Sequence, residues 1–449
     1  MEDLATKLKR LAIGSDALNE IHLQKLKNLL TRVYDQSPYY KEKFDKAGVN
    51  PHQFQSLDEF RNYPTFDKYE ERESQARSLK ELGHPLGLHL TCDIRKVNRI
   101  SASSGTTGTP SFQGHTKHDR EVILENFTRL AKVTDTLPGE RVMMAGVMSM
   151  WVAGIPTVDA LTEFGCMVIP IGGLVGTTKV IEMAQLTRPE TIICTPSFAR
   201  RILKTARDEM HVDLTEIGIK KLFVYGEPGG SVPEIVEEFR EGFGGAETYD
   251  MAGGTGALNP IFVSCKAHAG LHFIAPDYAY IELYDREKNV VLPFEDGAEG
   301  EFVYTGLDRE CGPLIRFMDG DLMRVTMKPC ECGLPGMRIA ILGRVDDMLL
   351  VKGVNVFPSA VRDVVLTLGD KVTGSVRIVK DSDGPVVEPP VNVKVECAGT
   401  PSDEVKTKLA EEIEERIQRQ LRFKAEVTLF DEGDLPAEYG PTGKAKLLE

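Results

Sequence analysis

The sequence contains no uninterrupted apolar run close to the ~20 residues that a membrane-spanning helix requires. Residues 1–10 are charged and amphipathic and lack the apolar core of a secretory signal, so we expect a cytoplasmic protein without a membrane partner. Positive charge is also scarce, because 54 lysines and arginines face 68 aspartates and glutamates. With a net charge of −14 and no basic stripe, we expect no nucleic-acid partner.

Cysteine is scarce too, with eight residues scattered through a chain of 449. In a cytoplasmic protein such cysteines are expected to be thiols rather than disulfides. We find no internal repeat and no low-complexity segment. What remains, 41% hydrophobic and 27% charged residues, is the composition of an ordinary globular protein, and the length predicts two or three domains.

Hydrophobic periodicity predicts the order of the elements. Apolar side chains at helical spacing over residues 17–35 predict an amphipathic opening helix. Between about 117 and 250, helical stretches alternate with short apolar strands, which is typical of a parallel sheet flanked by helices. We expect strands there at 141–147, 167–171, 191–195 and 221–225. Turn-separated strands then indicate a more antiparallel or barrel-like portion, at 279–284, 300–304 and 322–327.

The glycine- and charge-rich segment 343–347 separates this part from a compact α+β unit and has the composition of a hinge. In that unit we expect helices at 359–368 and 402–420 and strands at 374–379, 390–396 and 424–429. The predicted fold class is therefore α/β. A large N-terminal domain (1–342) contains mixed or parallel sheets flanked by helices, and a small mobile α+β domain (343–449) follows it.

Residues 101–110, Ser-Ala-Ser-Ser-Gly-Thr-Thr-Gly-Thr-Pro, combine small hydroxyl residues with two glycines. A loop of this composition can fold tightly and direct backbone N–H groups and hydroxyls at one anion, which suits a polyphosphate. No Gly-Lys-Ser/Thr follows the glycines, so it is not the P-loop of the kinases. A flexible linker is the alternative, but strand-like 95–100 and helical 119–133 flank the loop.

Further motifs occur in a fixed order along the chain. They are 23–49, with Arg32-Val33-Tyr34-Asp35-Gln36-Ser37-Pro38-Tyr39-Tyr40; Gly343-Arg344-Val345-Asp346-Asp347-Met348; Gly353-Val354-Asn355-Val356-Phe357-Pro358; and Pro441-Thr442-Gly443-Lys444-Ala445-Lys446. Together with the 101–110 loop, the chain resembles the acyl-adenylate-forming superfamily along its whole length, in particular its phenylacetate–CoA ligase branch.

The resemblance implies an ATP-dependent, AMP-forming ligase. Such an enzyme activates an aromatic acid of the phenylacetate or benzoate type as an acyl-adenylate and transfers it to CoA. ATP, CoA, Mg²⁺ and the aromatic carboxylate are the implied ligands, and homodimers are common in this branch. Two alternatives stay open: an adenylating enzyme that loads a carrier protein or another acceptor, and a non-adenylating relative that binds an acyl-CoA or a nucleotide.

By the same resemblance, the phosphate cradle comprises Ser103, Ser104, Gly105, Thr106, Thr107 and Gly108. Thr109 stands where many relatives have a lysine, and Lys117 is one possible replacement for that cation. Asp321 is the predicted ribose anchor, with Asp319 as a nearby competitor, because a carboxylate can accept both hydroxyls of the diol. Arg344 is its predicted partner at the ribose or the phosphates.

The adenine slot is predicted from two segments, Gly226-Glu227-Pro228 and Glu247-Thr248-Tyr249-Asp250, in which the tyrosine ring can stack on adenine. Here the chain departs from its relatives. They usually continue with a serine or threonine that meets the α-phosphate and a glutamate that binds magnesium, whereas this chain reads Met251-Ala252-Gly253. Asp250 or Glu227 could hold the metal and Thr255 could replace the hydroxyl. The alternative is a weakened or specialised site.

Lys444 resembles the C-terminal lysine that contacts the acid carboxylate and the α-phosphate during adenylation. A cation at that point neutralises two anions that otherwise repel each other. Lys446 is a rival. The resemblance also implies that the small domain swings about a hinge near Asp346, in 344–347, and then presents the CoA-binding loop Lys352-Gly353-Val354.

A Cys-x-Cys pair, Cys330 and Cys332, lies between Pro329 and Gly333, and Cys265 and His272 lie upstream. Three thiolates and one imidazole form a tetrahedral structural zinc site, and some members of this ligase branch carry zinc here. His268 and Cys311 are alternative ligands, and chance spacing is the competing explanation. We expect the remaining cysteines in the core: Cys92, Cys166, Cys194 and Cys397.

The acid pocket is predicted between segment 143–155 and the adenine strip, with the single tryptophan in its wall and glycines that leave room for a flat ring. A core helix start is the alternative for this segment. The predicted lining residues are Met148, Met150, Trp151, Ala153, Gly154, Gly253, Gly254 and Gly256.

Overall fold

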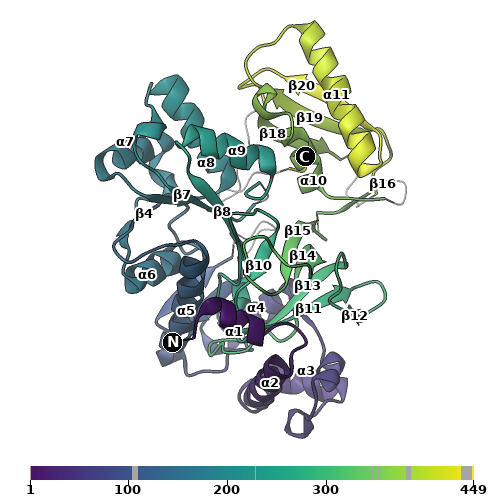
Figure 1. Ribbon diagram of the computed structural model, residues 1–449. Coiled ribbons are helices and arrows are strands. Elements are labelled where there is room, and N and C mark those ends of the chain that lie inside the picture. The colour runs from purple at the N-terminus through teal and green to yellow at the C-terminus, as the bar shows by residue number, and fades with distance from the viewer. Residues whose placement is uncertain are drawn as a thin grey trace.

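The computed structural model describes residues 2–103, 110–227, 229–345, 347–351, 354–380, 386–435 and 447–449 (Figure 1). Among these, no helix is long and apolar enough to cross a membrane. One large sheet runs through the N-terminal part, and a separate small α+β region holds the C-terminal part. The predicted α/β class is confirmed.

The large sheet joins a parallel half to an antiparallel half. Its parallel strands are β4 (Arg141–Met144), β5 (Met167–Ile169), β6 (Thr191–Cys194), β7 (Lys221–Tyr225) and β8 (Glu247–Ala252). Antiparallel pairing continues from β8 through β9 (Phe262–Ser264), β10 (Leu271–Phe273), β15 (Arg338–Arg344), β14 (Phe317–Thr326), β13 (Glu299–Gly306), β11 (Ala279–Asp285) and β12 (Val290–Leu292). The short β1 (Phe66–Asp67) pairs with β14. The antiparallel strands thus extend the same sheet.

Helices cover both faces of the parallel half, because alternate residues of each strand point to opposite sides. Ile192 and Leu222 pack with one group of helices, and their neighbours Ile193 and Phe223 pack with the other. The first group is α7 (Thr177–Thr187), α8 (Pro196–Lys204) and α9 (Pro233–Gly242), and the second is α5 (Lys117–Val133) and α6 (Ile155–Phe164).

The chain enters through a group of helices, of which the second and third share a core with Tyr280 of β11 and with loops of the antiparallel half. They are α1 (Leu4–Arg10), α2 (Asp16–Gln36), α3 (Pro38–Ala47) and α4 (Lys68–Leu82). Helix α2 buries one face of leucines, as its periodicity predicts, against loop residues Leu307 and Ile315. A two-stranded hairpin of β2 (Arg99–Ala102) and β3 (Phe112–His115) flanks the predicted phosphate loop. The predicted strand at 95–100 is wrong in part, because Asp93 caps a 3₁₀ turn over Ile94–Lys96 and delays the strand to Arg99.

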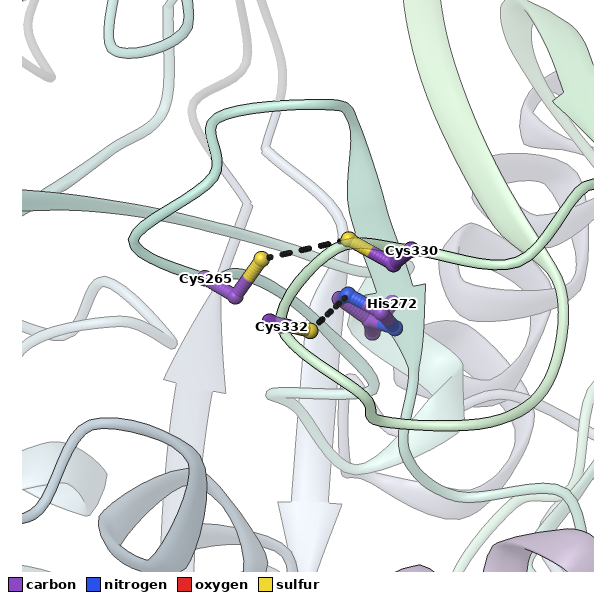
Figure 2. Close-up of side chains that lie close together, drawn as sticks. All are labelled: Cys265, His272, Cys330 and Cys332. Atoms are coloured by element: carbon purple, nitrogen blue, oxygen red, sulfur yellow. Dashed lines mark hydrogen bonds between the residues drawn. The ribbon is translucent and has the colours of Figure 1, made fainter.

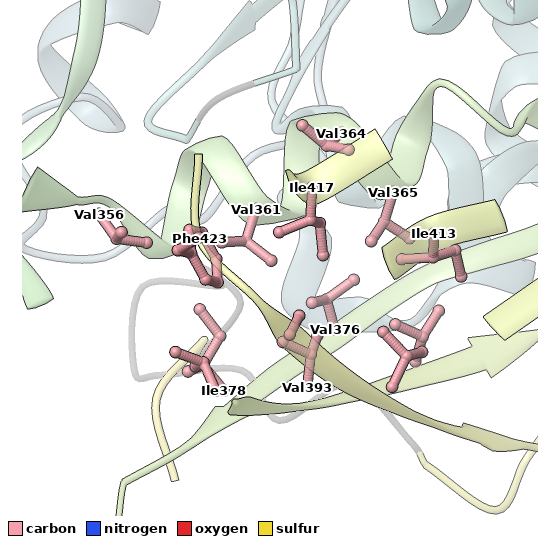
Figure 3. Packing of buried hydrophobic residues seen from close by; sticks show 14 of the residues in the cluster. Val356, Val361, Val364, Val365, Val376, Ile378, Val393, Ile413, Ile417 and Phe423 are labelled. Carbon is pink, nitrogen blue, oxygen red and sulfur yellow. The ribbon is translucent and has the colours of Figure 1, made fainter. Parts of the chain in front are cut away.

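The C-terminal region has a core of its own (Figure 3). Strands β18 (Val372–Val379), β19 (Val391–Cys397) and β20 (Ala425–Phe430) form its sheet, and α10 (Pro358–Leu366) and α11 (Asp403–Leu421) pack on it. Helical residues Val361, Val365, Ile413 and Ile417 meet strand residues such as Val376 in this cluster. The paired strands β16 (Leu349–Val351) and β17 (Val354–Val356) follow β15 along the chain and contribute Leu349, Val351 and Val356 to the same core.

Candidate functional site

The ends of the predicted phosphate loop are closed by backbone and side-chain hydrogen bonds. Ser103 N donates to Ser111 O at 2.8 Å, and Ser111 N donates to the hydroxyl of Ser103 at 2.9 Å. Gln75 of α4 holds the next residue, donating to Phe112 O at 2.8 Å and accepting from Phe112 N at 2.9 Å. The Ser103 hydroxyl therefore has a local structural partner, while residues 104–109, five of them predicted phosphate ligands, lie outside the described residues.

Beneath this hairpin lies a buried polar chain. Gln113 of β3 donates to the carboxylate of Glu71, and Arg309 donates to Gln113 Oε1 at 2.7 Å and to Gly114 O at 3.0 Å. Burial raises the pKa of Glu71 to about 7, although a hydrogen bond from Ser111 and the nearby Arg309 charge oppose the shift. Strand β3, which follows the phosphate loop, is thus hydrogen-bonded to a carboxyl group that is protonated more readily than that of an exposed glutamate.

This pKa predicts how stability depends on pH. The folded-state pKa of Glu71 is raised from its ordinary 4.5. The stabilisation that Glu71 contributes to the folded state is therefore fully present below about pH 4.5 and is lost as the pH rises through about 7. We expect Glu71→Gln to flatten the fall in melting temperature between about pH 5 and about pH 7.5, measured by calorimetry. Glu81→Gln, a substitution at an exposed position of the same helix, is the control and should show the same dependence of melting temperature on pH as the wild type. Equal slopes for Glu71→Gln and wild type would contradict the assignment.

Asp321 and Arg344 face each other across β14 and β15, where they are register partners. Arg344 Nη1 donates to Asp321 Oδ1 at 2.8 Å, and its Nη2 donates to the backbone oxygen of Asp319 at 3.2 Å. The side chain of Asp319 instead forms an ion pair with Lys68 at 3.0 Å and is more buried than that of Asp321. The sequence-predicted ribose pair is thereby brought together, and Asp321 is the more accessible of the two aspartates.

The two halves of the predicted adenine strip lie on neighbouring parallel strands. Val224 pairs with Asp250 and Tyr225 with Met251, so Gly226 and Glu227 follow directly beside them. The ring of Tyr249 was predicted to stack on adenine, but Tyr249 is 1% exposed and its ring packs edge-on against that of Phe223, with ring centroids 5.7 Å apart. Strand alternation turns Tyr249 and Asp250 to opposite faces, so stacking on adenine from Tyr249 does not fit the structure.

Two further strip residues precede Tyr249 on β8. Thr248 is fully buried. The carboxylate of Glu247 lies 3.4 Å from His268 Nε2 and 3.8 Å from Arg240 Nη2. Pro228 lies outside the described residues.

Asp250 and Glu227, the predicted replacements for the missing glutamate, have different surroundings. Asp250 accepts from the Ser231 hydroxyl at 2.9 Å, and burial raises its pKa to about 7. In the described part of the chain, no lysine or arginine forms an ion pair with it. Glu227 accepts from Ser197 N at 2.7 Å and lies 3.7 Å from Arg362. Asp250 is thus the carboxyl group that an added cation would stabilise more.

The predicted acid-pocket wall lies beside the phosphate hairpin. Ala102 bridges to Trp151, and Ala102 N donates to Met150 O at 2.6 Å. The Trp151 ring lies 5.5 Å from that of Tyr225, with 38° between their planes. Tyr225 was not predicted, although it ends strand β7 next to the adenine strip; its buried hydroxyl has no hydrogen-bond partner among the described residues.

The glycines predicted to leave room for the acid do not do so. A Cβ at Gly253 would meet Asn259 Oδ1 at 2.1 Å, one at Gly254 would meet the Tyr304 ring at 2.0 Å, and one at Gly256 would meet Leu314 at 2.7 Å. The chain's own side chains fill that space. Gly154 similarly allows a close approach to Val147 O, whereas Met150 is exposed and Ala153 packs with the α5–α6 core.

Cys265, His272, Cys330 and Cys332 converge, as predicted (Figure 2). Their ligand atoms all lie within 4.8 Å of one another. Cys265 Sγ and Cys330 Sγ are 3.7 Å apart, and Cys332 Sγ lies 3.4 Å from His272 Nε2. A tetrahedral zinc ion with ordinary bond lengths requires S···S edges of about 3.8 Å and S···N edges of about 3.6 Å, so these two separations match a zinc site.

The supporting contacts of the cluster fit a metal centre as well. Arg338 donates to Ala269 O at 2.6 Å and to Lys328 O at 2.8 Å, which braces both loops that carry the ligands. Burial lowers the pKa of His272 to about 4, so its ring is neutral, as a ligand must be. The alternatives lie elsewhere: His268 contacts Glu247, and Cys311 is buried beneath Gly114.

Residues 353–448 match the family model described as AMP-binding enzyme C-terminal domain. The chain is 30% identical over 440 residues to phenylacetate-coenzyme A ligase of Thermus thermophilus, covering 95% of both chains. It is 29% identical over 437 residues to the same enzyme of Aromatoleum evansii, covering 96% of this chain and 94% of the relative. The chain belongs to the phenylacetate–CoA ligase family. It is an acid–thiol ligase of the acyl-adenylate-forming superfamily.

Solved structures of a related ligase differ in how well they superpose. The crystal structure of 2-hydroxyisobutyryl-CoA ligase in the post-adenylation state, with 2-HIB-AMP, has a TM-score of 0.86 at 25% identity and covers 98% of this chain and 91% of its own. The same enzyme in the thioesterification state, with 2-HIB-AMP and CoA, gives a TM-score of 0.70 at 26% identity. The present arrangement is thus nearer to the post-adenylation state.

Several residues that the family resemblance implies for this ligase lie outside the described residues: Asp346, Lys352, Gly353 and Lys444. Val354 begins strand β17. Sequence reasoning missed Arg362, because an arginine in a helix is usually exposed. Its contact with Glu227 joins the C-terminal region to the adenine strip.

Proposed function

We propose that this ligase activates an aromatic carboxylic acid of the phenylacetate or benzoate type with ATP and transfers the acyl group to CoA. The similarity to phenylacetate-coenzyme A ligases over nearly the whole chain carries the proposal. The paired rings of Trp151 and Tyr225, beside the phosphate hairpin, support a flat substrate. ATP would bind with its phosphates in the 103–108 loop and its ribose at Asp321 and Arg344.

The chemistry follows from the charges that must meet. An acid carboxylate attacks the α-phosphate, and pyrophosphate leaves; Lys444 would neutralise both anions, and backbone N–H groups of the loop would hold the leaving phosphates. The thiol of CoA then attacks the acyl carbonyl, and AMP leaves. We assign CoA contact to Lys352, Gly353 and Val354. The domain boundary at 342/343, with a hinge at 344–347, is part of the proposal, and the separate C-terminal core supports it.

A panel assay tests the function. The protein is incubated with ATP, Mg²⁺ and CoA together with phenylacetate, benzoate or 2-hydroxyisobutyrate, and AMP and acyl-CoA are measured. AMP and acyl-CoA with an aromatic acid support the proposal, whereas turnover of 2-hydroxyisobutyrate alone would contradict the aromatic assignment. Pyrophosphate exchange without acyl-CoA points to a carrier-protein acceptor. The absence of AMP with every acid would favour the alternative that the protein binds an acyl-CoA or a nucleotide without adenylating an acid.

Two metals belong to the proposal. Zinc would be held by Cys265, His272, Cys330 and Cys332 as a structural ion. Magnesium would shield the phosphate charges, and Asp250 would hold it in place of the glutamate that relatives carry. Asp250 suits this role better than Glu227, whose carboxylate already meets an N–H group and an arginine. A cytoplasmic location and a homodimer stay predictions from the sequence.

Asp250→Asn should raise the magnesium requirement and slow adenylation at least a hundredfold. A carboxylate on a metal at a phosphoryl centre contributes several kcal/mol, and each ~1.4 kcal/mol changes the rate about tenfold. The measurement is a magnesium titration of pyrophosphate exchange. Ser231→Ala, which removes only the hydrogen bond to Asp250, is the matched control and should stay within about threefold of wild type. An unchanged magnesium dependence in Asp250→Asn would exclude the assignment.

A further inference from the structure

Helix α10 presents one face to the N-terminal part of the molecule. Arg362 and Leu366 lie four residues apart on the helix and therefore share that face. Leu366 is buried in the cluster that α7, α8 and α9 form with the parallel strands, rather than in the core of its own region. Arg362 is 4% exposed. The helix thus docks on the large domain with an apolar contact and a buried cation side by side.

The cation meets a buried carboxylate of the adenine strip. Arg362 Nη1 lies 3.7 Å from Glu227 Oε2, and the two side chains are 5% and 4% exposed. The other carboxylate oxygen, Oε1, accepts from Ser197 N in the first turn of α8 at 2.7 Å. The ion pair therefore joins α10, the segment after β7 and the start of α8.

A buried pair differs from the other polar contacts at this junction. Lys204 and Glu432 also form an ion pair between the two parts, but their side chains are 48% and 27% exposed, so water and salt screen the attraction. Arg200 donates to the backbone oxygens of Val372 and Thr373. Residues of any type at those two positions would provide the same acceptors. Breaking a buried pair is costly, because it leaves a charge without compensation in a low-dielectric site.

We infer that Arg362 is a positioning residue whose buried ion pair with Glu227 holds the C-terminal region in the orientation for adenylation. The inference rests on the proposed two-step function. The superposition supports it, because the chain matches the post-adenylation state of a related ligase better than its thioesterification state. When the C-terminal region swings away, the pair separates and both groups become hydrated. The contact therefore favours the first half-reaction and opposes the change to the second.

Measuring the two half-reactions separately distinguishes a positioning role of Arg362 from general structural support. We expect Arg362→Met to slow pyrophosphate exchange at least tenfold, while conversion of pre-formed acyl-adenylate and CoA to thioester stays within twofold of wild type or becomes faster. Arg362→Lys, which keeps the charge, should recover most of the exchange rate. A parallel fall of both half-reactions would overturn the inference, because a merely structural residue would act on both.

Two further variants sharpen the test. Glu227→Gln keeps an acceptor for Ser197 N and removes the negative charge. If loss of the ion pair causes the slowing in Arg362→Met, the double variant Arg362→Met/Glu227→Gln should catalyse pyrophosphate exchange no more slowly than Arg362→Met alone. Lys204→Met, which breaks the exposed pair at the same junction, is the matched control and should stay within about twofold. Multiplying effects in the double variant would contradict the coupling.

A measurement without turnover keeps the inference separable from the proposed function. Amide hydrogen exchange of residues 358–366 and 197–203, followed by mass spectrometry in the absence of substrates, reports whether α10 is docked. We expect exchange in both segments to rise at least fivefold in Arg362→Met and to stay unchanged in Lys204→Met. Unchanged exchange in Arg362→Met would overturn the inference even in an active ligase. Inactivity of the wild type with every acid would overturn the proposed function alone.

Discussion

Lys444→Ala is expected to slow acyl-adenylate formation about a hundred- to thousandfold, the usual effect of removing one preorganised group that stabilises developing charge. Two anions, the acid carboxylate and the α-phosphate, must approach each other, and a single cation between them offsets their repulsion. Thioester formation from pre-formed adenylate should stay close to wild type, because in the proposed mechanism the C-terminal region presents a different loop in that step. Pyrophosphate exchange and single-turnover acyl-CoA formation measure the two steps separately.

Lys446→Ala is the matched control, since it removes an equal charge two residues along the chain. It should leave both half-reactions within about threefold of wild type. An equal loss of both half-reactions in Lys444→Ala would contradict the two-orientation mechanism. A larger effect of Lys446→Ala than of Lys444→Ala would move the assignment to the rival lysine.

The parallel half of the sheet could be predicted from sequence because its inner strands are buried on both faces. Such strands are near-continuous apolar runs, as in Thr191–Cys194, and amphipathic helices separate them. Helix α2 was predicted within one residue at each end for a related reason, since one face of leucines repeats over its whole length. Strand β14 begins at Phe317, earlier than predicted, because Asp319 and Asp321 interrupt its apolar pattern.

The candidate site was less predictable, because its details depend on which way single side chains point. The motif around Tyr249 located the correct strand, but pairing with β7 turns the ring into the core. Gly253 and Gly254 suggested empty space, whereas the nearby Asn259 and the distant Tyr304 fill it. The pairing of Asp321 with Arg344 was predictable from the family resemblance, which assigned both residues to one proposed ribose site.

Arg362 gave almost no signal in the sequence. A single arginine in a helix is usually exposed, and only the docking of α10 on the large domain shows that this one is buried. The convergence of the proposed zinc ligands, by contrast, was predictable from their residue types. The sheet bridges their distance along the chain, because β10, which carries His272, pairs on one side with β9, just before Cys265, and on the other with β15, just after the loop of Cys330 and Cys332.

Cys330→Ser is expected to abolish stoichiometric zinc binding and to lower the melting temperature by about 10 °C. Metal binding supplies folding free energy directly, and a loss of about 4 kcal/mol corresponds to a shift of that size in a protein of a few hundred residues. The effect should reach beyond the cluster. Strand β10 and its neighbours lead directly to β8, which carries Asp250, so adenylation should become more heat-sensitive. Metal analysis and calorimetry of the purified proteins test this.

Cys332→Ser should behave like Cys330→Ser, because a serine hydroxyl is a poor substitute for a thiolate in a tetrahedral zinc site. Cys92→Ser, a half-buried thiol outside the cluster, is the matched control and should keep about one equivalent of zinc. Removal of the metal with a chelator should reproduce the thermal shift in wild type and leave Cys330→Ser unaffected. A wild-type protein that contains no zinc, yet melts at the same temperature as Cys330→Ser, would show that the four side chains converge without a metal. Their short S···S and S···N separations would then need another cause, because three thiols and an imidazole gain little from one another when no cation lies between them.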